Sequence, residues 1–121
     1  MDLASRYVFV GLLWLVAAMV EGLWMGVTGA TQYLNLHIVM VLSGGVLGIV
    51  FGTLLRAWPK LAGDGWAGRQ FIVWNVGVLA QAVGAIVRAW GWGDALIGSA
   101  SVVVLAAAFM MLAMFYRSAT A

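Results

Sequence analysis

Two ionisable side chains lie inside apolar stretches of this sequence, where a charge is costly. Glu21 interrupts the apolar run 7–29, and His37, the only histidine of the chain, lies near the start of the run 33–55. An imidazole can ligate a metal or relay a proton, and a carboxyl group can orient that imidazole. Ionisable groups within apolar spans usually mark a functional site, so the chemistry of this chain is expected at Glu21 and His37.

Each of these two residues also has an ordinary structural interpretation. His37 could be an interfacial histidine that bonds a carbonyl group or a lipid headgroup. Glu21 could be a neutral carboxyl group that is hydrogen-bonded to a neighbouring helix. Because Glu21 lies about eight residues before the end of its run, the two residues should differ in depth by only about 6 Å at the helical rise. We therefore expect that they can meet across the first helix pair.

A face of small residues follows His37 along the second apolar run. It consists of Gly44, Gly45, Gly48 and Gly52. Such spacing usually allows helices to pack closely in a membrane, and it could also leave room for a flat macrocycle. Met25 lies one turn beyond Glu21, near the expected depth of His37.

The composition indicates the environment in which these residues work. The 121 residues are 65% hydrophobic and only 8% charged, whereas a soluble domain usually carries about 25% charged residues. A soluble fold cannot bury this much apolar surface, so the expected solvent is the lipid bilayer. The lack of cysteine excludes disulfides, thiolate metal sites and iron–sulfur clusters. The charges are spread along the chain, which indicates no nucleic-acid partner.

Four apolar runs are long enough to cross a bilayer, which takes roughly 20 helical residues. They cover about residues 7–29, 33–55, 71–90 and 95–116. Pro59 should end the second helix, because proline lacks an amide donor and disfavours helix at the preceding residue. Short connections favour antiparallel neighbours. The expected fold is all-α, an integral membrane bundle of four transmembrane helices that forms a single domain, 1–121.

Basic residues near the expected helix ends predict the orientation. Arg88 lies toward one side, and all others share the opposite side: Arg6, Arg56, Lys60, Arg69 and Arg117. Because basic residues favour the cytoplasmic side, both termini are expected in the cytoplasm, in a multi-pass protein of the bacterial inner membrane. Tryptophans near the expected helix ends fit the membrane interface; they are Trp24, Trp58, Trp66, Trp90 and Trp92.

A resemblance to a known family is carried by residues 36–52, which read LHIVMVLSGGVLGIVFG. This stretch resembles the second helix of subunit I in haem–copper oxidases, particularly the cbb-type oxidases and their nitric-oxide-reductase relatives. In that family a histidine near the outer end of the helix ligates the low-spin haem, and a glycine-rich face follows it. The third run is similar to the family's next helix through Phe71, Trp74, Asn75, Val76 and Gly77.

The resemblance implies that His37 ligates the iron of a haem b. It also implies that the porphyrin lies beside Gly44, Gly45 and Gly48, with Glu21 as a neighbour of the imidazole or of the propionates. The sixth iron ligand stays open, because Met25, a symmetry-related His37 or a partner's residue could supply it.

The departures from the family are as informative as the resemblance, which covers about half of the chain. Family members have about twelve helices, a second axial histidine on a much later helix and three further histidines for copper. A chain with one histidine has none of these. The resemblance therefore implies that the chain is not an oxygen or nitric oxide reductase by itself.

Three hypotheses for the function follow. The first is a small haem-associated membrane subunit for electron transfer or haem handling, as a homo-oligomer or within a larger complex. The second is a cofactor-free structural or assembly subunit that docks through its glycine faces. The third is a small oligomeric transporter with Glu21 and His37 on an ion path, although four short-looped helices with few buried polar groups offer a poor pathway.

Overall fold

The computed structural model describes residues 1–120, which are helical apart from short connections and contain no strand. Two short segments precede the π-helical part of the second span: η1 (Thr31–Tyr33) and α2 (Leu34–Ile38). The remaining elements are α1 (Leu3–Thr28), η2 (Val39–Val46), α3 (Leu47–Ala57), α4 (Pro59–Ala62), α5 (Ala67–Ala89) and α6 (Ala95–Thr120). Residues 1–120 contain four helical spans that are long and apolar enough to cross a membrane: Leu3–Thr28, Thr31–Ala57, Ala67–Ala89 and Ala95–Thr120. The predicted all-α architecture of four such helices is confirmed.

The helical spans extend beyond the predicted apolar runs by four residues at three ends and by two residues at the two ends of the second span. Asp2 caps α1, since its carboxylate accepts a hydrogen bond from the Ser5 N–H at 2.8 Å. Gly29 closes the other end in a left-handed conformation with φ 70°. The prediction that Pro59 ends the second span is confirmed, because α3 ends at Ala57. Pro59 also starts the short helix α4, which the sequence analysis did not predict.

The second span changes its helical pitch just after His37. The segment η2 is π-helical, and at its end the N–H of Leu47 donates to the carbonyl of Leu42, five residues earlier. Gly44 and Gly45 lie within this segment. A π-helical segment turns the residues that follow it relative to an unbroken α-helix. It therefore sets which face of α3 is directed toward α1.

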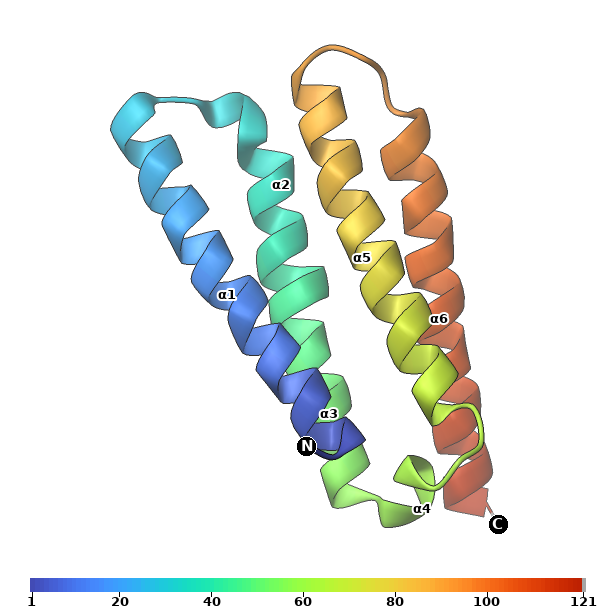
Figure 1. The fold of residues 1–121 in the computed structure, drawn as a ribbon. Coiled ribbons are helices and arrows are strands. Elements are labelled where there is room, and N and C mark those ends of the chain that lie inside the picture. Colours follow the sequence, from blue (N-terminus) through green and yellow to red (C-terminus); the bar gives the residue numbers. More distant parts are fainter. Residues whose placement is uncertain (121) are drawn as a thin grey trace.

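The spans form two helical hairpins that lie side by side (Figure 1). In the first hairpin α1 packs along η2 and α3, and in the second α5 packs along α6. Contacts of α5 with α2 and η2 join the hairpins, and consecutive spans are antiparallel as predicted. Both termini lie at one end of the bundle (Figure 1), which we call the terminal end. Five of the six basic residues belong to elements at this end.

Aromatic rings and one amide hold the two hairpins together near the terminal end. The ring centroids of Tyr7 and Phe71 lie 4.7 Å apart, and those of Phe51 and Trp74 lie 4.6 Å apart, both edge to face. The Tyr7 hydroxyl donates to the side-chain carbonyl of Gln70, which is fully buried. The amide of Gln70 in turn donates to a carbonyl of α6 at 3.1 Å. The side chain of Gln70 thus connects α1, α5 and α6, because its oxygen accepts from α1 and its nitrogen donates to α6.

Candidate functional site

His37 and Glu21 meet across the first hairpin. The Nδ1 atom of His37 lies 2.8 Å from Oε2 of Glu21, which confirms the expected contact. Helix α1 positions Glu21 and helix α2 positions His37, in the half of the hairpin that lies away from the terminal end. The His37 side chain is 32% exposed, whereas that of Glu21 is only 12% exposed. The pair therefore presents the imidazole outward and keeps the carboxyl group inside.

This contact leaves one imidazole nitrogen available for a ligand. When the Nδ1–H donates to Glu21, the lone pair of the neutral ring lies on Nε2. Within residues 1–120 the Nε2 atom makes no hydrogen bond. A carboxylate bonded to one nitrogen fixes the ring and makes the other nitrogen a better metal ligand. The pair can thus serve as a single oriented ligand.

Gly22, which was not among the predicted site residues, makes room for the imidazole. A Cβ atom at this position would lie 2.8 Å from Cε1 of His37, closer than a real side chain tolerates. In the sequence, the position of Gly22 directly after Glu21 was the one feature that could have indicated this role. The second carboxyl oxygen of Glu21, Oε1, is buried and has no hydrogen-bond partner among the described residues. The orientation of the pair therefore depends on the backbone of α1 as well as on the hydrogen bond.

Met25 lies beside this pair rather than within it. It lines a crevice of about 270 Å³ at the end of α1, together with Gly22, Gly26, Thr31 and Leu34. Gly22 belongs both to this crevice and to the contact with the His37 ring. Met25 and the imidazole thus share Gly22 as a neighbour, and the role of Met25 as an iron ligand stays a prediction.

The glycine face packs against α1. A Cβ atom at Gly44 would lie 2.4 Å from Cγ of Trp14, and one at Gly45 would lie 2.4 Å from Cδ2 of Leu15. At Gly48 the nearest atom, Cα of Gly11, would be 3.5 Å away. Close helix packing is therefore the role that the structure gives to these glycines. A macrocycle on the same face would have to displace α1.

Two further amide side chains in the third span, Gln81 and Asn75, make different kinds of hydrogen bond. Gln81 forms an interhelical hydrogen bond, since its amide donates to Oγ of Ser101 on α6 at 3.0 Å. Within the described part of the chain, Asn75 does not bond to another helix, because its amide donates to the carbonyl of Phe71 in its own helix at 2.8 Å. Bonding to a carbonyl one turn back satisfies a polar side chain without a second helix.

A metal ion at His37 would need ligands from elsewhere. Residues 1–120 contain no cluster of three or more His, Cys, Asp or Glu residues that could hold a metal ion. Haem fits this limitation, because its porphyrin brings four nitrogens and asks the protein only for axial ligands. An oriented imidazole is the kind of group that serves as an axial ligand, whereas the closely packed glycine face does not provide a cradle for a porphyrin inside the hairpin.

No family model, curated protein or solved structure matches this chain. The relationship of residues 36–52 to haem–copper oxidase subunit I therefore stays a prediction. The contact between His37 and Glu21 is the observation on which a functional interpretation can be built.

Proposed function

We propose that this chain is a haem-associated subunit of the bacterial inner membrane, in which Nε2 of His37 is an axial ligand of haem b. The observation that carries the proposal is the 2.8 Å contact between Nδ1 of His37 and Oε2 of Glu21. A histidine that ligates a metal almost always donates its other N–H to such an acceptor. Bound haem would supply one-electron chemistry, and the protein would serve electron transfer or haem handling.

The chain supplies a single histidine, so the second axial position belongs to another group or stays open. Met25 in the neighbouring crevice is one source, and His37 of a second copy or a residue of a partner chain are the others. Because the glycine face is filled by α1, the accessible part of the site is the exposed edge of the imidazole. A homo-oligomer or a larger membrane complex would cover that edge.

A second candidate function is a cofactor-free structural or assembly subunit. The close approach of Gly44 to Trp14 favours the absence of a cofactor, because the small residues pack the first hairpin and leave no room for a macrocycle. Docking to a partner would then use a surface other than the glycine face. The two functions predict different compositions for the purified protein, with and without haem.

The absorption spectrum of the protein tests the proposal. The chain should be made in haem-replete cells and purified in mild detergent with its native partners. We expect a Soret band that is lost in His37→Ala and kept in Asn35→Ala, a matched change at an exposed polar residue two positions earlier. An assembled wild-type protein without haem would leave His37 as an ordinary interfacial residue and favour the cofactor-free subunit.

A further inference from the structure

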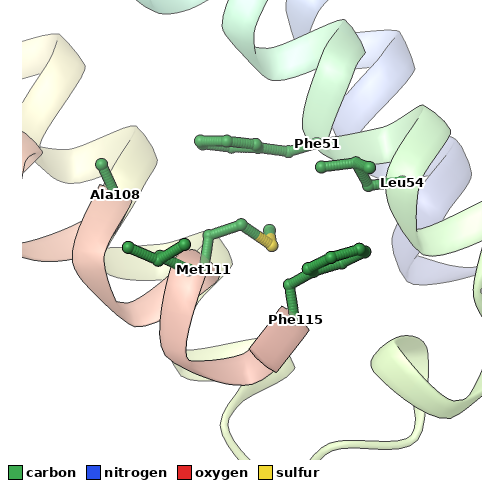
Figure 2. A pocket seen from close by; sticks show the side chains of 6 residues that line it. Phe51, Leu54, Ala108, Met111 and Phe115 are labelled. Atoms are coloured by element: carbon green, nitrogen blue, oxygen red, sulfur yellow. The ribbon is translucent and has the colours of Figure 1, made fainter. Parts of the chain in front are cut away.

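An apolar crevice separates the two hairpins in the half of the bundle near the terminal end. Its volume is about 300 Å³. Phe51 and Leu54 of α3 are directed across it toward Met111 and Phe115 of α6 (Figure 2). The lining is completed by Ala108 and Leu112. No polar side chain lines this crevice, so it offers nothing to a polar substrate.

The crevice reaches the expected membrane interface through an aromatic pair. The ring of Trp58 packs against that of Phe115, which lines the crevice, with a centroid distance of 5.2 Å. Trp58 lies just after α3 and is 43% exposed. An amphipathic indole ring at a helix end is typical of the boundary between acyl chains and headgroups. A molecule in the crevice would therefore have its polar part near Trp58.

The charges at this boundary favour an anion. Arg56 pairs with Asp2 at 3.1 Å, and Arg117 pairs with Asp64 at 2.9 Å. Lys60, two residues after Trp58, is exposed and makes no salt bridge within residues 1–120. A basic side chain next to a membrane surface attracts anionic headgroups.

We propose that the crevice binds one acyl chain of an anionic phospholipid from the leaflet at the terminal end, with the phosphate group near Lys60. A volume of about 300 Å³ holds a segment of such a chain, and the rest of the chain extends into the bilayer. An acyl chain is narrow, flexible and wholly apolar, as the lining requires. This site is separate from His37 and does not depend on haem.

Native mass spectrometry tests this site on the full chain. The protein is reconstituted in nanodiscs of equal amounts of phosphatidylglycerol and phosphatidylcholine, and the lipids that stay bound after release are identified. We expect wild-type protein to prefer phosphatidylglycerol about fivefold, the effect of one basic residue at an anionic surface. Lys60→Gln should abolish the preference, whereas Arg6→Gln, which removes a charge from α1 at the same end, should keep it.

A second pair of variants tests the crevice itself. Ala108→Phe should fill it and abolish the retention of both lipids, and Ala106→Phe, on an exposed part of the same helix, should not. Ala108→Leu repeats the test with a smaller side chain should the larger one prevent folding. Equal retention of the two lipids by wild-type protein would overturn the headgroup assignment. If Ala108→Leu retained as much lipid as Ala106→Phe, the assignment of the crevice as the lipid site would be overturned.

Discussion

The pair of His37 and Glu21 shows how two polar side chains persist within an apolar span. Each group alone would be costly in this environment, and the hydrogen bond between them reduces the cost of both. Oε1 of Glu21 is already buried without a partner among the described residues. Replacing His37 therefore also affects Glu21, which would lose the one side-chain partner it has. The double variant His37→Ala, Glu21→Gln separates the loss of a ligand from the loss of that partner.

Asp64 anchors the connection between the hairpins at the terminal end. Its carboxylate accepts hydrogen bonds from the N–H of Trp66 at 2.8 Å and from Arg117 at 2.9 Å. The bond from Trp66, with the charge of Arg117, holds the pKa of Asp64 below its usual value of 3.8. A lowered pKa in the folded state stabilises the protein above the unfolded pKa, and this contribution is lost as the pH falls through the folded pKa.

We therefore predict that Asp64→Asn lowers the thermal unfolding temperature at pH 7 by a few degrees. The difference from wild-type protein should start to shrink as the pH falls below about 4, the pKa of aspartate in the unfolded chain, and should be lost below the lowered pKa of the folded protein, where the wild-type carboxylate is protonated. Asp94→Asn is the control, because Asp94 is 70% exposed in its pair with Arg88 and such pairs contribute little. If Asp64→Asn lowered the unfolding temperature by the same amount at pH 7 and at a pH below the folded pKa of Asp64, the result would contradict the role of the carboxylate charge.

At the scale of elements, the glycines of the second span determine how closely α1 can approach. Gly44 and Gly45 face side chains, Trp14 and Leu15, at distances that no Cβ atom would tolerate. Gly48 faces the backbone of Gly11 with ordinary van der Waals space for a methyl group. The packing thus leaves no space for a Cβ atom at Gly44 and Gly45 in η2, whereas it leaves space for one at Gly48 at the start of α3.

This difference gives a prediction for alanine substitutions. Gly44→Ala should destabilise the protein by about 1–3 kcal/mol, since it forces Trp14 out of its place. Gly48→Ala should be neutral or stabilising, because it fits and alanine favours a helix. Gly98→Ala, where the structure has no atom within 4 Å of the added Cβ atom, is the control. Reversible unfolding in detergent measures all three. Equal destabilisation by Gly44→Ala and Gly48→Ala would show that α1 packs differently.

The sequence predicted where the helices lie along the chain better than it predicted which face of each helix packs against its neighbours. Apolar runs located the four spans, and the similar depth of Glu21 and His37 predicted their contact. The π-helical segment η2 was not predictable, because its residues are as apolar as an α-helical run and its hydrogen bonds depend on packing against α1 and α5. Gln70 was also missed, since it lies next to the polar connection although it is fully buried. Which way a side chain points follows from packing between helices, and a linear pattern does not contain that information.

At the scale of the whole molecule, both termini and five of six basic residues lie at one end of the bundle (Figure 1). In multi-pass membrane proteins, short connections rich in Lys and Arg favour the cytoplasmic side. We therefore predict that reporter fusions at either terminus read cytoplasmic and that a fusion in the connection 90–94 reads periplasmic. A periplasmic signal from one terminus would mean that one of the four helices does not cross the membrane.

The most direct test of the central claim is a titration of haem-free protein with haemin, followed at the Soret band. We predict saturable binding that ends at one haem per two chains for a site shared by two copies, or at one per chain for ligation by Met25 or an open position. His37→Ala should show no saturable binding, and Glu21→Gln should bind about 10–100-fold more weakly. Equal binding by wild-type protein and His37→Ala would contradict the assignment of His37 as the iron ligand.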